Sequence, residues 1–264
     1  MDLQLLVERF TSSLMNDMHS LSSMISEMSS EDEASKKEIL VRLRVHLKKI
    51  LSSDKLTVEE VLQKLFWLYY LQQRKFARSN HIWSNHISYW DFNIRHICAI
   101  VQQMRKLPQN TIILSPIAGN CFLEAILERL GFRILANDIK DREFSFMTAP
   151  ISRMDGMAFI SQFVSENPDV PFVLLMSWAP MDGHECPEIG TQLIQFAATT
   201  TECQCVFHIS EGRGGCTDIS ATFDVIDSNF REVWRFERYA SFYENINMLM
   251  PLHDALSCLV PMKK

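Results

Sequence analysis

Residues 112–124 read Ile-Ile-Leu-Ser-Pro-Ile-Ala-Gly-Asn-Cys-Phe-Leu-Glu, and this stretch decides the fold. A short apolar run passes through a turn of small residues around Gly119 into a segment with helical periodicity. A strand that turns into a helix exposes backbone N–H groups at the helix start, where a ligand can approach closely. The stretch therefore predicts a strand–turn–helix unit of an α/β domain, with a ligand site beside Gly119.

Short apolar runs and helix-length segments alternate after Pro108. The runs are 111–115, 133–137, 170–178 and 204–210, and the helical segments are about 120–130, 156–166, 187–200 and 217–229. Buried runs that alternate with helices predict a mostly parallel sheet covered on both faces. The runs at 232–241 and 247–262 have no helix between them, so they predict an antiparallel strand pair at the end of the sheet.

The chain before this α/β domain has helical periodicity only. We expect an N-terminal helical bundle over 1–107 and the α/β domain over 108–264. Helical patterns cover about 3–28, 31–51, a segment after Thr57 and 86–106, and Ser30 with Glu33 and Thr57 with Glu60 have the form of capping boxes. The Met-rich apolar stripe of the first pattern either packs on the other helices or binds another chain. Residues 1–106 are thus the expected region for a protein partner or for self-association.

Composition and charge narrow the class of protein. The 264 residues are 47% hydrophobic and 22% charged, which is typical of a globular protein with a sizeable core. No apolar run approaches the roughly 18 residues of a membrane span, and the N-terminus lacks the basic flank of a signal peptide. The 7 Cys are scattered and odd in number, which favours a reducing compartment. We expect an intracellular protein, cytoplasmic or nuclear, without a membrane contact, and its net charge of -6 does not indicate nucleic acid binding.

Over about 111–262 the order of elements resembles the class I (Rossmann-like) S-adenosylmethionine (SAM) methyltransferases. In the first motif of that family, an apolar strand leads to an acid and a Gly-x-Gly turn. Gly119 stands at the central glycine and Ser115 at the acid, while Ile117 and Cys121 replace the flanking glycines. The resemblance implies that SAM is the cofactor and that the first cofactor-binding residues are Ser115, Ala118, Gly119 and Asn120.

Two acids follow later segments of the chain, at places where the resemblance implies contacts with the nucleoside. Asp138 follows a strand about 20 residues after Gly119, where such folds bind a ribose diol. The resemblance places Asp155 and Gly156 at the adenine amino group. The alternatives are a solvated acid for Asp138 and a helix N-cap for Asp155, and both roles of Asp155 can hold at once.

Residues 177–182, Ser-Trp-Ala-Pro-Met-Asp, lie at the end of the apolar run 170–178, and the carboxyl end of such a strand borders the cleft in open parallel sheets. They resemble the Asp/Asn/Ser-Pro-Pro-aromatic loop of enzymes that methylate amines. The resemblance implies catalytic roles for Ser177, Trp178 and Pro180, with Met181 and Asp182 at the substrate. The alternative is a proline turn in which Trp178 anchors the core.

The segment 209–218 contains three glycines within four residues, which specify an unusual backbone path. We interpret it as a loop at the mouth of the cleft, with Glu211 and Arg213 available to a substrate. The alternative is a connector in which Thr217 caps the next helix.

Histidines and cysteines lie close together in the second half of the chain without the Cys-x-x-Cys spacing of a zinc site. They are His184, Cys186, Cys203, Cys205, His208 and Cys216. Cys203 and Cys205 alternate with Val206 and His208 as the faces of a strand do, so we expect core cysteines and no metal. A nucleophilic Cys216 beside His184 or His208 is supported by no motif.

Two functions of different classes remain open. The first is methyl transfer from SAM to a nucleophile held at 177–182, a reaction that depends mainly on alignment. The alternative is a catalytically inactive methyltransferase-like module that acts as a scaffold through its helical region. The missing glycines and the missing acid favour the module, whereas Asp138, Asp155 and the Trp178 loop favour the enzyme, which we take as the leading hypothesis. A nicotinamide enzyme is disfavoured because Gly-x-Gly-x-x-Gly is absent.

Overall fold

The computed structural model describes residues 33–65, 94–140, 144–236 and 255–262 of the chain. The chain divides into two compact units, residues 1–87 with 92–94 and residues 88–91 with 95–264. The domain boundary predicted at residue 107 stays a prediction. The helix predicted over 3–28 lies outside the described residues.

The described part of the first unit is helical. Helix α3 spans Glu33–Leu51 and buries Leu43, Leu47 and Ile50, in agreement with the pattern in the sequence. The predicted capping box after it is confirmed: the N–H and the hydroxyl of Thr57 donate to Glu60 Oε2 at 2.7 and 2.9 Å, and the Glu60 N–H donates to Thr57 Oγ1 at 3.2 Å.

The second unit contains a six-stranded sheet. Its strands are β1 (Ile112–Ser115), β2 (Ile134–Ala136), β3 (Phe172–Ser177), β4 (Cys203–Ser210), β5 (Phe230–Phe236) and β6 (Ala255–Pro261). Their order is β2-β1-β3-β4-β6-β5, the first four are parallel, and β6 is antiparallel to both of its neighbours. The predicted fold class is therefore confirmed, and β6 lies between β4 and β5.

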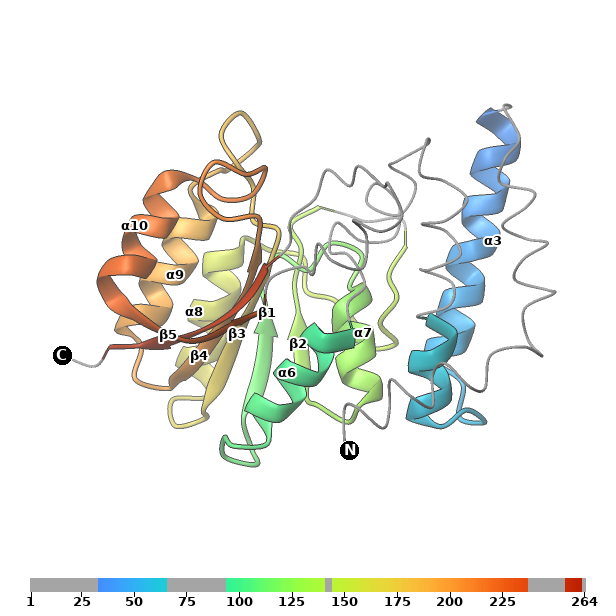
Figure 1. Ribbon diagram of the computed structural model, residues 1–264, viewed down its shortest axis with the longest axis horizontal. Helices are drawn as coiled ribbons and strands as arrows, with labels where there is room; N and C mark the ends of the chain where they lie inside the picture. The colour runs from blue at the N-terminus through green and yellow to red at the C-terminus, as the bar shows by residue number, and fades with distance from the viewer. Residues whose placement is uncertain (1–32, 66–93, 141–143, 237–254, 263–264) are drawn as a thin grey trace. The chain divides into compact units, whose positions relative to one another are not determined.

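Helices cover both faces of this sheet (Figure 1). They are α6 (Ile94–Met104), α7 (Phe122–Arg129), α8 (Gly156–Glu166), α9 (Ile189–Thr199) and α10 (Ser220–Asn229). Helices α8, α9 and α10 lie side by side on one face, and α6 and α7 lie on the other. The bounds of α8 are those predicted, and those of α7, α9 and α10 differ from prediction by a few residues.

The core explains why the central strands are continuous apolar runs rather than alternating ones. Every residue of β1 is buried, and so is β3 up to its last residue, because helices cover both faces of each strand. On the face of α8 and α9, the main buried side chains are Leu114, Ile160, Leu174, Met176, Leu193 and Ile194. No helix among the described residues is both long and apolar enough to cross a bilayer.

The strand order fixes where a ligand can bind. The chain passes from β1 to its neighbour β2 and later enters β3 on the other side of β1. Such a reversal leaves a crevice at the carboxyl ends of the strands. The loops after Ser115, Ala136, Ser177 and Ser210 all begin at this edge of the sheet.

Candidate functional site

The turn after β1 has the backbone that a glycine favours. Gly119 and Cys121 both adopt a φ of 57°, and Cys121 is the N-cap residue of α7. A Cβ built on Gly119 would meet no atom within 4 Å among the described residues, so the space beside this glycine is open. The backbone conformation, rather than crowding, is therefore the reason for glycine at this position.

Asp138 lies directly against this turn, as the chain spacing suggested. Its Oδ2 accepts a hydrogen bond from the Gly119 N–H at 2.8 Å, and its Oδ1 accepts from the Lys140 N–H at 2.9 Å. The carboxylate is 8% exposed, so it is a well-held group rather than the solvated acid of the alternative. The structure brings two of the predicted cofactor residues together, and the ribose role of Asp138 stays a prediction.

Asn137 ties three loops of the site together and was missed in the sequence. Its Nδ2 donates to the carbonyl oxygens of Pro116 at 2.9 Å and Met154 at 3.0 Å, and its Oδ1 accepts from the Met154 N–H at 3.1 Å. The residue is fully buried. Its polar side chain at the end of an apolar run was the available signal, because a buried amide must find partners.

Asp155 begins α8 as its N-cap. Its Oδ1 accepts from the N–H groups of Met157 at 2.9 Å and Ala158 at 3.0 Å. Gly156 packs against the loop after β1, since a Cβ built on it would lie 3.5 Å from Pro116. The N-cap interpretation is confirmed, and the contact of Asp155 and Gly156 with adenine stays a prediction.

Ser115, at the end of β1, holds a buried acid that the sequence analysis did not consider. Its Oγ donates to Glu124 Oε1 at 2.7 Å, and the two residues are 1% and 2% exposed. Burial raises the pKa of Glu124 to about 7; the Ser115 hydrogen bond opposes this shift, and the Asp138 charge adds to it. The turn after β1 thus has a carboxyl group beneath it, contributed by the first turn of α7.

The loop after β3 is fixed to the next strand. Ser177 pairs with Ile209, and the N–H of Trp178 donates to the Ile209 carbonyl at 3.1 Å. Trp178 has a φ of 59°, which is rare for a bulky residue and typical of functional loops. The predicted residues Ser177, Trp178, Pro180 and Met181 are partly buried, and Asp182 is exposed. Their contacts with an acceptor stay predictions.

An ion pair joins the loops on either side of β1. Lys140 Nζ lies 3.0 Å from Glu185 Oε2, and both side chains are exposed. Lys140 follows β2 and Glu185 follows β3, which are the two neighbours of β1. The pair therefore spans the carboxyl end of β1 and forms a rim beside the site, although an exposed pair contributes at most about 1 kcal/mol.

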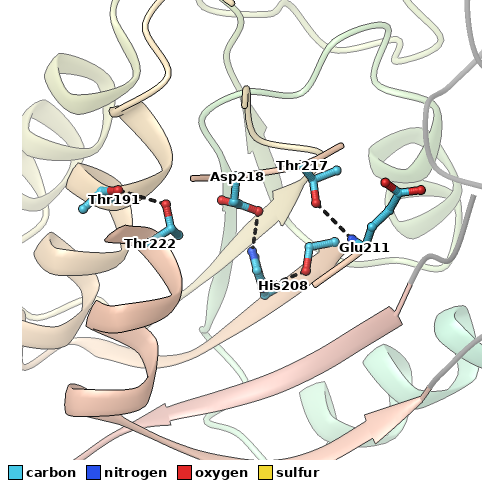
Figure 2. Close-up of polar contacts among 7 residues, drawn as sticks. Thr191, His208, Glu211, Thr217, Asp218 and Thr222 are labelled. Atoms are coloured by element: carbon cyan, nitrogen blue, oxygen red, sulfur yellow. Dashed lines mark hydrogen bonds and ion pairs between the residues drawn. The ribbon is translucent and has the colours of Figure 1, made fainter. Parts of the chain in front are cut away.

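A buried His–Asp pair lies at the end of β4 (Figure 2). His208 Nε2 lies 3.0 Å from Asp218 Oδ2, and the side chains are 5% and 0% exposed. Ser210 Oγ lies 3.5 Å from His208 Nδ1. The other oxygen of Asp218 has no hydrogen-bond partner among the described residues and faces Gly190, where a Cβ would lie 2.7 Å from it. Glycine at the start of α9 thus makes room for a buried carboxylate.

This pair connects the two loops that the sequence assigned to the substrate. The Asp218 N–H donates to the Ala179 carbonyl at 3.0 Å, within the loop after β3. The Glu211 N–H donates to Thr217 Oγ1 at 2.9 Å, within the glycine-rich loop (Figure 2). The pair was not predicted, because His208 was considered only as a metal ligand or as a partner of Cys216, and its contact with Asp218 joins segments on either side of the glycine-rich loop. These hydrogen bonds hold the loop after β3 and the glycine-rich loop in place beside the buried His208–Asp218 pair.

Glu211 and Arg213 contact the protein itself in this structure. Glu211 accepts from the Cys216 N–H, and its Cβ leaves no room for a side chain at Gly215. Arg213 pairs with two carboxylates of α10, Asp224 at 2.9 Å and Asp227 at 2.6 Å. Their roles toward a substrate therefore stay predictions. The alternative role of Thr217 as a helix cap is wrong, because the N-cap residue of α10 is Ile219.

The cysteine and histidine cluster separates in space. Cys203 and Cys205 are buried in β4, as predicted for core cysteines, and burial raises the pKa of the Cys203 thiol to about 12. Within the ranges that the structure describes, no three His, Cys, Asp or Glu side chains gather as metal ligands would.

No family model and no curated protein matches this chain. Among solved structures, one from Listeria monocytogenes, put forward as a class I SAM-dependent methyltransferase, is 12% identical over 92% of this chain and 86% of that chain, with a TM-score of 0.49. A SAM-dependent methyltransferase from Archaeoglobus fulgidus is 13% identical over 62% of this chain and 94% of that chain, with a TM-score of 0.39. Both are described as SAM-dependent methyltransferases, and the first is also described as class I. At these values the likeness adds no evidence on function, which must come from the site.

Proposed function

We propose that this chain is a SAM-dependent methyltransferase that holds its cofactor at the carboxyl ends of β1 and β2. The observation that carries the proposal is the 2.8 Å hydrogen bond between the Gly119 N–H and Asp138, beside open space at Gly119. A glycine turn at a helix start and an acid after the next strand are the groups that a nucleoside site of an open parallel sheet needs.

The two side chains that replace the family's glycines pack within the protein. Cys121 is buried, and its Sγ lies 3.8 Å from the Gly119 carbonyl oxygen. Ile117 is partly buried against the core under α8 and α9. Phe122, the next residue after Cys121, is buried against Phe146 with ring centroids 5.0 Å apart. This packing supports a competent site, because a side chain blocks the cofactor only if it enters the space beside Gly119.

The residues present fit SAM by their chemistry. Ala118, Gly119 and Asn120 would border its methionine part, and the two oxygens of Asp138 suit a ribose diol. Asp155 would meet the adenine amino group while it caps α8. When bound, SAM supplies a methyl group on a sulfonium that is already activated for transfer.

The chain's own contribution to the reaction would be alignment. Ser177, Trp178 and Pro180 would hold the acceptor nucleophile at the end of β3, with Met181, Asp182, Glu211 and Arg213 around it. The His208–Asp218 pair fixes this loop through the Ala179 carbonyl, and so restricts where an acceptor can lie. Holding two reactants in line supplies most of the rate in a transfer of this kind.

Calorimetry of the full chain with SAM and with S-adenosylhomocysteine tests the proposal. Asp138→Asn keeps an oxygen that can accept from the Gly119 N–H, so it removes the charge while it preserves the turn. We expect it to weaken binding by about 1–3 kcal/mol, or about 5- to 150-fold. Asp169→Asn is the matched control, because Asp169 is an exposed acid in the turn before β3, at the other end of the strands.

The absence of binding at millimolar concentration would reject the proposal and favour the inactive module. Unchanged affinity in Asp138→Asn would reject the ribose role alone. A loss of affinity in both variants would show that the effect is one of net charge rather than of the site.

A further inference from the structure

The end of β1 has a buried hydroxyl group that is hydrogen-bonded to a buried carboxyl group. Ser115 donates to Glu124 Oε1 at 2.7 Å, and the residues are nine positions apart in the chain. Both are buried, so the hydrogen bond fixes the carboxyl group beneath the turn that contains Gly119. Ionising a buried carboxyl group lowers the stability of the folded protein. A buried acid at this place therefore suggests that it serves a function.

We propose that Glu124 is a positioning residue for the cofactor: held by Ser115, its ionised carboxylate supplies the negative charge that the end of β1 lacks. This inference rests on the proposed function, because it names a group of the same site. It assigns to the first turn of α7 a role that no motif in the sequence indicates.

The electrostatics of the turn favour a cationic ligand. Asp138 lies on the other side of the turn, and its charge acts unfavourably on an ionised Glu124. SAM has a sulfonium, an ammonium and one carboxylate, so its net charge is positive. A cation near both acids relieves their repulsion, and its binding therefore favours the ionised form of Glu124.

The other ionisable groups on the elements around Glu124 can be named. Glu128 and Arg129 follow on its own helix, and α6, on the same face of the sheet, contains Arg95 and the buried His96. Neither β1 nor β2 contains an ionisable side chain. The segment 144–150, which contacts α7 through the Phe122–Phe146 ring pair, contains none either. Asp141, Arg142 and Glu143 lie outside the described residues. Asp138 is thus the charged neighbour that the structure shows to act on Glu124.

This arrangement makes cofactor affinity depend on pH. Burial raises the pKa of Glu124 to about 7, so the group is about nine-tenths protonated at pH 6 and about nine-tenths ionised at pH 8. Binding that requires the carboxylate must first remove the proton at pH 6. We expect the wild-type protein to bind SAM about tenfold more tightly at pH 8 than at pH 6.

The test is calorimetry of the full chain with SAM at pH 6, 7 and 8, in buffers of different ionisation enthalpy. Glu124→Gln should bind SAM at pH 8 no more tightly than the wild type does at pH 6, because it lacks the charge. Glu128→Gln is the matched control, since it removes a carboxylate one turn further along the same helix. The cofactor's own amino group titrates near pH 8, and the difference between these two variants removes that contribution.

Further arms keep the test decisive if Glu124→Gln does not fold. In the wild type at pH 6, the binding of each SAM molecule should release close to one proton. This value is corrected for the titration of the cofactor's amino group, measured either with the variants or with free SAM. Ser115→Ala removes a hydrogen bond that lowers the pKa of Glu124, so the pKa should rise further. The increase in SAM affinity with pH should then occur at a higher pH than in the wild type. Ser115→Asp combined with Glu124→Gln moves the charge onto β1 and should restore tight binding.

The outcomes separate this inference from the proposed function. No SAM binding by the wild type at any of these pH values overturns the proposed function, and this inference with it. Binding whose pH dependence is the same in the wild type and in Glu124→Gln overturns the role of Glu124 and leaves the proposed function standing. So does proton release that stays near zero at pH 6.

Discussion

Replacing Glu124 by Gln should change how the stability of the protein depends on pH, even without a ligand. The ordinary pKa of a glutamate is 4.5, and burial raises that of Glu124 to about 7. Between these values the folded protein retains a proton that the unfolded chain has lost, so stability falls as the pH rises. The folded protein keeps the full contribution of protonated Glu124 to its stability below about pH 4.5, and that contribution is lost once the pH exceeds about 7. The difference corresponds to about 3 kcal/mol.

Urea denaturation of the full chain at pH 5, 6, 7 and 8 measures this effect. The quantity to compare is the free energy of unfolding of Glu124→Gln minus that of the wild type, because titration of other groups cancels in the difference. It should rise by about 2.5 kcal/mol from pH 5 to pH 8, as the wild type acquires a buried charge and the variant does not. Glu128→Gln should show no such rise. Parallel curves for Glu124→Gln and the wild type would refute the reasoning.

Three further predictions concern the loops around the site. Asn137→Ala should destabilise the protein by about 2–4 kcal/mol, because it removes three buried hydrogen bonds, and a loss below 1 kcal/mol in urea denaturation would contradict the bridging geometry. Asp218→Ala should cost about 3–5 kcal/mol by leaving His208 buried without its partner, whereas a melting temperature equal to that of the wild type would speak against the pair. Lys140→Ala and Glu185→Ala should show a coupling energy below about 1 kcal/mol in a double-mutant cycle, and a coupling that persists in 1 M salt would rule out an exposed ion pair.

Local periodicity explains why most elements of the α/β domain could be predicted. The runs that became β1, β3 and β4 are apolar because both faces of these strands are covered, and that burial is visible in a window of a few residues. The place of β6 between β4 and β5 was not visible, because it depends on pairing between segments distant in the chain. The order of the elements along the chain can thus be predicted from the sequence, whereas the neighbours of each strand in the sheet cannot.

The site was predictable where the chain itself sets the spacing. Gly119 follows the first strand and Asp138 follows the second strand of one strand–helix–strand unit, so both lie at the same end of that unit. Their contact therefore follows from the topology of the unit. Glu124 was missed because its burial depends on how α7 packs, and an acid in the first turn of a helix is ordinarily solvated. Arg213 was expected to face a substrate, yet Asp224 and Asp227, three residues apart on α10, hold it in this structure.

The distribution of buried polar groups supports a ligand site more strongly than any single motif does. Asn137, Glu124 and the His208–Asp218 pair are buried within or directly after the elements that meet at the carboxyl edge of the parallel strands. Folding does not require them, since replacing buried hydrogen-bonding partners by apolar groups of the same shape can leave stability nearly unchanged or increase it. A scaffold without a ligand would gain from such replacements at this edge. Polar and ionisable groups at this edge, which cost stability, are what the proposed alignment site for a charged cofactor and its acceptor would need.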